Sequence, residues 1–131
     1  MTQKKIPDLG GFNGTESYHY LNFCKNLKFT DGMAYLCKEV EAFWVADLVA
    51  SVQSLPKIRE KNSFIVWRIV VEDSEAVVDA HWDSEGVDKK GNSIYSKDKE
   101  LYRQEIKYTD FPEGTFEFYQ CGDVVMLKRE Y

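Results

Sequence analysis

The chain has 131 residues, 44% of them hydrophobic, which is enough apolar material for one folded domain without disulfide or metal support. Its formal net charge of -5 argues against non-specific binding to nucleic acid or to an anionic membrane, and favours a partner with a basic surface. The three cysteines form no CxxC pair and the N-terminus lacks an apolar signal segment, so we expect a cytoplasmic protein.

The N-terminal part of the chain predicts two short helices. Residues 1–14 are polar and contain three glycines, so we expect a flexible N-terminal segment ahead of a single domain at residues 15–131. Thr15 can cap the first helix, at residues 16–23, and Thr30 or Asp31 can cap the second, at residues 32–40, because their side-chain oxygens can accept a hydrogen bond from the first helical turn. We interpret the basic residues 25–28 as a connection.

Residues 41–55 predict the central helix and form the longest apolar-rich stretch of the chain. Apolar residues recur at spacings of three and four around most of this helix, so we expect it to be covered on most sides. A narrow polar strip contains Asp47 and Ser51, and Pro56 ends the helix. We expect Asp47 to be marginal or partly buried; the alternative is a desolvated carboxylate with a raised pKa that acts as a base or a ligand.

The rest of the chain predicts a sheet. Residues 56–62 are interpreted as a charged loop. β-Branched and aromatic residues, with turn residues between them, indicate strands at residues 63–71, 75–83, 101–108, 115–120 and 123–128. The first two strands form a hairpin, and the first is apolar on both faces, as in an interior strand. Because helices come first and strands follow, we predict an α+β domain with two or three N-terminal helices packed on a four- to five-stranded antiparallel sheet.

An acidic stretch at residues 72–88 contains seven carboxylates and neither lysine nor arginine. Such a strand face must be solvated, bound to cations or matched by a basic partner. Solvation is the ordinary interpretation; the functional interpretation is docking into a basic groove of another protein, one that normally holds nucleic acid. Residues 84–100 predict a long loop or protruding ribbon beside this face. The predicted partner-binding residues are Glu75, Asp79, His81, Asp83, Glu85, Asp88 and Tyr95.

Asp79, His81 and Asp83 also suggest a metal site, because alternate residues of a strand point the same way, about 7 Å apart per step. Two carboxylates and an imidazole can hold Mn, Fe or Zn. The outer pair is too far apart for one ion unless the strand bends. A metal-dependent hydrolase that uses this face is therefore an alternative, while the favoured prediction has no metal and no cofactor.

The cysteines give little sign of chemistry. His19, Cys24, Cys37 and Cys121 match no common zinc-site spacing. Buried cysteine as a small apolar side chain is the favoured interpretation. No local signature supports a nucleophilic cysteine paired with His19 or His81. We therefore predict no catalytic residues.

Three stretches, residues 29–53, residues 108–112 and the apolar C-terminal segment that ends in LKREY, together resemble DUF6876, a family of uncharacterised bacterial and phage proteins. The resemblance covers about residues 12–131. Its more specific parts are the Phe-Thr-Asp-Gly helix start and the pattern Trp44, Asp47, Ser51 and Gln53. The resemblance implies no activity and no catalytic residues. It implies genes in prophages and mobile elements, and hence an accessory protein that acts on a host system in the host cytoplasm.

These observations lead to a functional prediction. We expect a non-catalytic interaction protein, a phage or mobile-element inhibitor that binds a host defence protein such as a CRISPR effector nuclease. The partner would present a basic surface and would itself bind nucleic acid, whereas this chain would contact neither nucleic acid nor membrane directly. The alternatives are the metal-dependent hydrolase and a homodimeric structural module that uses exposed aromatic residues.

Overall fold

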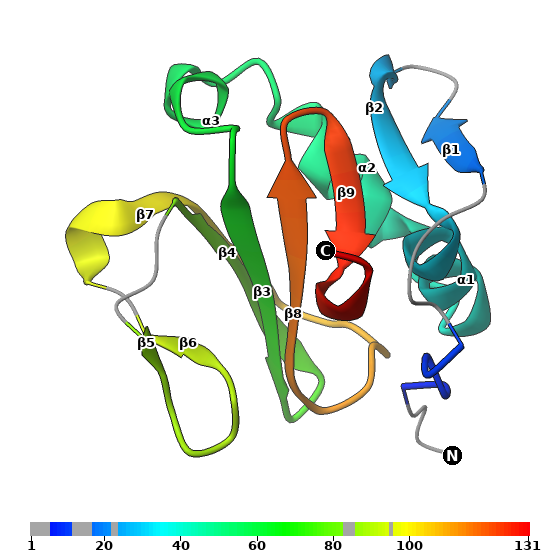
Figure 1. The fold of residues 1–131 in the computed structure, drawn as a ribbon. Coiled ribbons are helices and arrows are strands. Elements are labelled where there is room, and N and C mark those ends of the chain that lie inside the picture. Colours follow the sequence, from blue (N-terminus) through cyan, green and yellow to red (C-terminus); the bar gives the residue numbers. More distant parts are fainter. Residues whose placement is uncertain (1–5, 12–16, 22–23, 83–85, 95) are drawn as a thin grey trace.

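The structure, a computed structural model, describes residues 6–11, 17–21, 24–82, 86–94 and 96–131, with the backbone alone at 20–21 and 24–26 (Figure 1). The domain is α+β, with a mostly antiparallel seven-stranded sheet in the order β1-β2-β9-β8-β3-β4-β7. The helices are α1 (Asp31–Glu39), α2 (Phe43–Ser51) and α3 (Pro56–Glu60), with 3-10 turns η1 (Lys97–Lys99) and η2 (Lys128–Glu130). The strands are β1 (Tyr18–Leu21), β2 (Cys24–Thr30), β3 (Ile65–Glu72), β4 (Glu75–His81), β5 (Gly86–Val87), β6 (Ser93–Ile94), β7 (Glu100–Ile106), β8 (Gly114–Cys121) and β9 (Val124–Leu127).

The prediction of a helix near residue 18 and a basic connection after it is wrong. Both segments are strands: β1 pairs antiparallel with β2, and β2 pairs parallel with β9. Leu27 and Phe29 are buried while Lys28 between them is half-buried, the two-residue alternation of a strand. The helices are therefore not simply N-terminal, and the sheet has more strands than the four or five predicted.

The predicted helix near residues 32–40 is confirmed as α1, and Thr30 caps it. Its Oγ1 accepts a hydrogen bond from the Met33 backbone N–H at 3.4 Å. Glu130 from the far end of the chain adds a second cap, because its Oε2 accepts from the Gly32 N–H at 3.2 Å. The central helix is shorter than predicted and ends at Ser51. The predicted charged loop after it contains α3, which begins at Pro56, a favourable first helical position.

The hydrophobic core lies between the helices and one face of the sheet. Ile65, Trp67, Ile69 and Val71 alternate toward the helices along β3, and each is at most 4% exposed. The Trp67 ring stacks on Phe118 of β8 with 6.2 Å between ring centroids. The β3–β4 hairpin is also confirmed.

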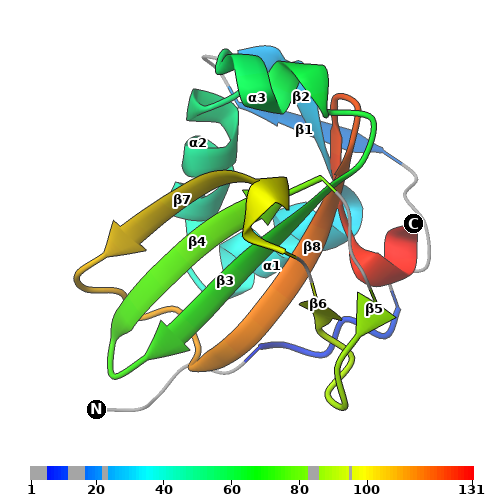
Figure 2. The ribbon, with the colours of Figure 1, turned by 90° about the vertical axis from the view of Figure 1, so that its left-hand side faces the viewer.

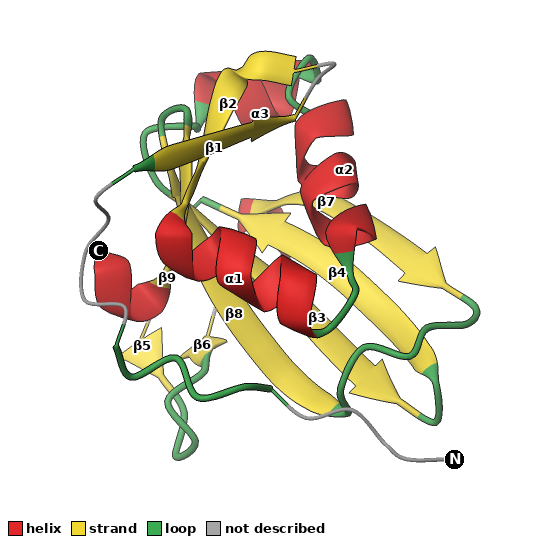
Figure 3. Ribbon diagram, turned by 90° about the vertical axis from the view of Figure 1, so that its right-hand side faces the viewer, coloured by secondary structure: helices red, strands yellow, loops and turns green. Residues whose placement is uncertain are grey.

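The two faces of the sheet are covered differently. Helices α1 and α2 lie over one face (Figure 3), and the short β5–β6 hairpin lies against the other (Figure 2). Ile6 and Leu9 from the N-terminal segment are partly buried against the core. Within the described residues, every helix is too short or too polar to cross a membrane.

Candidate functional site

The acidic strand does not form the exposed face expected for it. Asp79 is 5% exposed and His81 is 0% exposed, so the expectation that both face solvent is wrong. The physical reason is that β4 is an inner strand. Asp79 lies between Arg68 of β3 and Arg103 of β7 in the strand register, so its neighbours supply the positive charge that the local sequence lacks.

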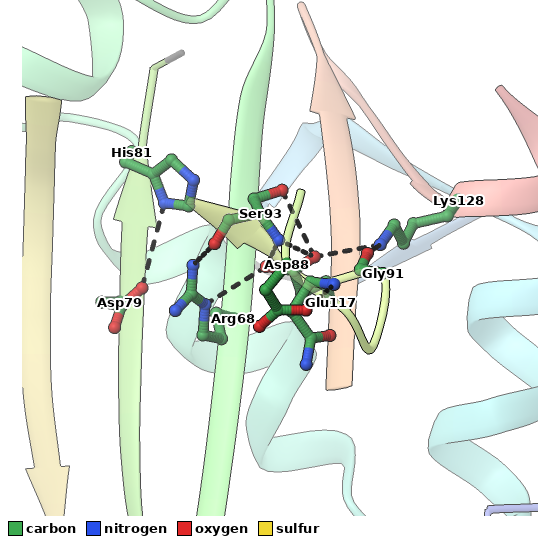
Figure 4. A network of polar contacts seen from close by, with 9 residues as sticks. Arg68, Asp79, His81, Asp88, Gly91, Ser93, Glu117 and Lys128 are labelled. Atoms are coloured by element: carbon green, nitrogen blue, oxygen red, sulfur yellow. Dashed lines mark hydrogen bonds and ion pairs between the residues drawn. The ribbon is translucent and has the colours of Figure 1, made fainter. Parts of the chain in front are cut away.

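A buried carboxylate on β8 organises this face of the sheet. The Glu117 side chain accepts hydrogen bonds from Arg68 Nε at 3.2 Å and from Lys128 Nζ at 3.0 Å (Figure 4). It also accepts from the Ser93 backbone N–H at 3.1 Å, while Arg68 Nη2 donates to the Ser93 carbonyl at 2.7 Å. Both backbone groups of Ser93 are thus satisfied by charged side chains of the sheet. The cluster fastens the β5–β6 hairpin to the domain, which is a structural role.

The remaining predicted partner-binding residues are spread along the chain. Glu75 and Asp88 are exposed, whereas Asp83, Glu85 and Tyr95 lie outside the described residues. Asp88 stabilises the tip of the β5–β6 hairpin, where its Oδ1 accepts from the Asn92 N–H at 3.0 Å. This backbone hydrogen bond lowers the pKa of the Asp88 carboxyl below its ordinary value. The structure therefore does not gather the described members of the set into one exposed patch.

The suggested metal and zinc sites have no complete counterpart in the described part of the chain. His81 Nδ1 and Asp79 Oδ1 are 4.0 Å apart, and Asp83 is not described. Across residues 6–11, 17–21, 24–82, 86–94 and 96–131, no three His, Cys, Asp or Glu side chains are placed to share an ion. The Cys24 side chain is not among those described.

An apolar cavity of about 540 Å³ lies beside α1 and brings Cys37 near His19. Burial raises the pKa of the Cys37 thiol to about 11, so the thiol is protonated at neutral pH and is a weak nucleophile. His19 Nε2 lies 2.9 Å from Asp31 Oδ1, and Ser17 Oγ donates to the same oxygen at 2.8 Å. In a catalytic triad the histidine lies between the nucleophile and the carboxylate. Here Asp31 lies between His19 and Ser17 instead. The arrangement is not that of a hydrolase triad.

A second cavity, of about 600 Å³, opens between α2 and the edge strand β7, and we name it the α2–β7 cleft. Figure 3 shows α2 over the side of the sheet where β7 is the edge strand. One wall comes from α2 and the other from β7 and the residues after it. The lining residues are Trp44, Asp47, Leu48, Ser51, Gln104, Ile106, Tyr108, Thr109 and Asp110.

Hydrogen bonds and ring packing hold the second wall in place after the end of β7. The Thr109 N–H donates to the Ser74 carbonyl at 2.7 Å, and Thr109 Oγ1 accepts from the Phe111 N–H at 3.0 Å. Phe111 is buried and meets the Trp44 ring edge-on, with 6.2 Å between ring centroids. Tyr108 is left 69% exposed at the mouth of the cleft.

Asp47 and Asp110 are both exposed, and both line this cleft. The predicted polar strip of Asp47 and Ser51 is present, and it is the side of α2 that lines the cleft, while Val45, Val49 and Ala50 on the other sides are buried. Sequence reasoning missed the cleft because Asp110 is far from Asp47 in the chain. One signal in the sequence could have indicated it: Asp47 and Asp110 belong to two of the stretches, residues 29–53 and 108–112, by which the chain resembles DUF6876.

Gln53, the last residue of that pattern, has a different role. Its side-chain amide donates to Gln120 Oε1 at 3.1 Å, and Gln120 donates back to Gln53 Oε1 at 2.8 Å. Trp67 Nε1 also donates to Gln120 Oε1, at 3.1 Å. This amide pair joins the C-terminal end of α2 to the sheet, so it positions the helix without lining the cleft.

The fold and the cleft define an α+β domain whose open groove lies between a helix and a sheet edge. The chain belongs to the family described as a family of unknown function, DUF6876, which matches residues 3–131. Comparison with curated proteins and with solved structures finds no match. The Trp44–Ser51 and Tyr108–Asp110 parts of the resemblance meet in the α2–β7 cleft, which makes this cleft the candidate functional site.

Proposed function

We propose that this protein is a non-catalytic interaction protein that binds another protein through the α2–β7 cleft. The observation that carries the proposal is the convergence, in one open cleft, of two stretches by which the sequence resembles its family. Exposed aromatic side chains such as Tyr108, 69% exposed, make good anchors in protein interfaces because they bury a large area with little loss of conformational freedom.

The chemistry of the cleft supports binding over catalysis. Its two carboxylates, on Asp47 and Asp110, are exposed to water, and its other polar side chains are hydroxyls and an amide. A catalytic carboxylate is ordinarily desolvated by burial, which these two are not. Exposed carboxylates beside aromatic and aliphatic side chains are better suited to a basic group of a partner.

A narrower form of the proposal names the biological setting. The partner is a host defence protein, such as a CRISPR effector nuclease, and this chain inhibits it by covering a basic surface that otherwise holds nucleic acid. The acidic net charge of -5 supports this form, since such surfaces attract acidic proteins. Inhibition of DNA cleavage by the purified protein, lost in the cleft variants below, tests it.

The experiment is affinity capture from a lysate of the source cells, followed by mass spectrometry and by calorimetry with each purified candidate. Tyr108→Ala is the test variant, because Tyr108 is exposed and lines the cleft. Tyr35→Ala is the matched control, because Tyr35 is an exposed tyrosine that lines the apolar cavity beside α1 instead. A partner that binds the wild type and the control but at least about tenfold more weakly to Tyr108→Ala supports the proposal.

The contrary results are equally definite. If Tyr108→Ala leaves the affinity of the partner unchanged and Tyr35→Ala lowers it, the binding site is the apolar cavity beside α1. Stoichiometric metal in the purified protein, together with hydrolytic activity, would favour the hydrolase that uses Asp79 and His81. A sedimentation equilibrium that shows a stable dimer would favour the homodimeric module.

A further inference from the structure

The β7 strand is an open edge of the seven-stranded sheet. It pairs with β4 on one side, and on its other side no described strand pairs with it. Every second residue of an edge strand presents its backbone N–H and C=O away from the sheet, which is a template for another strand. Such an edge beside a cleft is the arrangement by which extended peptides add to sheets.

The strand register identifies the outward-facing residues. The β3–β4 turn has two residues, so Glu72 and Glu75 form the hydrogen-bonded pair that closes it. Alternate residues of β4 from Glu75 onward therefore bond to β3, and the residues between them, such as Val78, bond to β7. Gln104 lies opposite Val78 in the register, so these two residues form a hydrogen-bonded pair. The residues on either side of Gln104, Arg103 and Glu105, therefore present their backbone groups outward.

The side chains on the two faces of β7 restrict what can add there. Gln104 and Ile106 face the α2–β7 cleft, whereas Arg103 and Glu105 lie on the opposite face as an exposed ion pair with 3.7 Å between Nη2 and Oε1. Alternating charge at an edge discourages a wholly apolar strand. A partner strand must therefore place polar side chains on the face that carries Arg103 and Glu105. Its side chains on the other face must fill the cleft.

The cleft specifies the charge of that filling side chain. Asp47 and Asp110 supply two carboxylates, and none of the described residues that line the cleft is basic. The apolar walls from Trp44, Leu48 and Ile106 suit the aliphatic stem of a long side chain, and the exposed carboxylates suit its cationic end. A guanidinium can also stack on the Trp44 ring.

We propose that the occupant is an extended segment of the partner protein that adds to β7 as an eighth strand and places an arginine or lysine in the α2–β7 cleft. This inference rests on the proposed function, because it names the part of the partner that the same cleft binds. Backbone hydrogen bonds to Arg103 and Glu105 hold the segment, and the basic side chain between Asp47 and Asp110 selects it.

A displayed library of random dodecapeptides, selected on the intact protein, is the probe. The enriched peptides are expected to share an arginine or lysine within alternating β-branched residues. Asp47→Asn keeps the shape of the side chain and removes its charge, and it should weaken the best peptide about tenfold. Glu60→Gln, an exposed carboxylate on α3 away from the cleft, is the matched control and should leave binding unchanged.

Arg103→Pro tests the backbone contact. Proline removes the outward N–H of this edge position without removing a β4 hydrogen bond, so the domain should fold and the peptide should fail to bind. Arg103→Ala keeps the N–H and should bind like the wild type. If Arg103→Pro does not fold, amide exchange of the wild type replaces it: peptide binding should protect the Arg103 and Glu105 amides.

Three results would overturn the inference: enriched peptides without a basic residue, affinity indifferent to Asp47→Asn, or no added protection at the Arg103 and Glu105 amides. A dimer that Arg103→Pro abolishes would also overturn it, since the occupant of the edge would be a second copy. A captured partner that needs Tyr108 but tolerates Arg103→Pro would leave the proposed function standing and refute strand addition alone. A partner indifferent to Tyr108 would refute both.

Discussion

Replacing Glu117 with glutamine should destabilise the domain strongly. The wild-type carboxylate is 1% exposed and accepts from Arg68 at 3.2 Å and from Lys128 at 3.0 Å, as well as from the Ser93 N–H. The amide of Glu117→Gln carries no charge, so both cations lose their buried partner. Removing one member of a buried ion pair costs roughly 3–5 kcal/mol. Because Arg68 and Lys128 are 18% and 36% exposed, water can replace part of the lost interaction, and we expect about 3 kcal/mol.

Urea unfolding, followed by tryptophan fluorescence, measures this loss. With a slope on the order of 1.5 kcal/mol per molar urea, the midpoint should fall by about 2 M. Glu105→Gln is the matched control, because Glu105 is also a strand glutamate beside an arginine but is 77% exposed. It should change the free energy of unfolding by less than about 0.5 kcal/mol. A loss below about 1 kcal/mol for Glu117→Gln, or one equal to the control, would refute our reasoning that burial makes this cluster strong.

Gly32→Ala should lower the thermal midpoint, because a Cβ there would lie 2.5 Å from Leu127 Cδ1; such overpacking costs roughly 1–3 kcal/mol, measurable by circular dichroism. The hairpin tip should lose order below about pH 4, as followed by the NMR shifts of the amides bonded to Asp88. The pKa of Asp88 is lower in the folded protein than in the unfolded chain. The stabilisation of the hairpin tip by Asp88 is therefore complete above the ordinary aspartate pKa, and it is lost as the pH falls through the pKa of the folded protein. Native-state alkylation, mapped by mass spectrometry, should modify Cys121 faster than Cys37, because Cys37 is buried and its pKa is raised to about 11.

Each of these three predictions has a matched control. Gly11→Ala should leave the midpoint unchanged, because no atom lies within 4 Å of the added Cβ. Asp88→Asn should remove the pH response of the hairpin tip, and a response that persists would assign it to another group. In the urea-unfolded protein Cys37 and Cys121 should react at similar rates; a native Cys37 that reacts as fast as Cys121 would contradict its burial.

Local patterns in the sequence predicted those elements whose partners lie nearby. Strand β3 follows from its run of β-branched and aromatic residues, and the cap of α1 follows from Thr30. The β3–β4 hairpin follows from a turn between two apolar runs. For the Thr30 cap and the hairpin turn, the group that satisfies the backbone is within a few residues in the chain.

Long-range pairing explains the errors. The β1 and β2 segments form strands because β9, from the other end of the chain, pairs with β2. Asp79 lies on an inner strand, opposite Arg68 and Arg103 of two strands that are distant from each other in the chain. The α2–β7 cleft requires Asp47 and Asp110 from opposite walls, and neither stretch alone indicates the other.

The parallel pairing of β2 with β9 has a consequence for synthesis of the chain. The first two strands leave the ribosome well before β9, the strand with which β2 pairs. Until then Phe29 and Leu27 lack the layer that buries them, and closing so long a loop is entropically costly. Nascent chains should therefore be most prone to aggregation, and most dependent on chaperones, until β9 has left the ribosome.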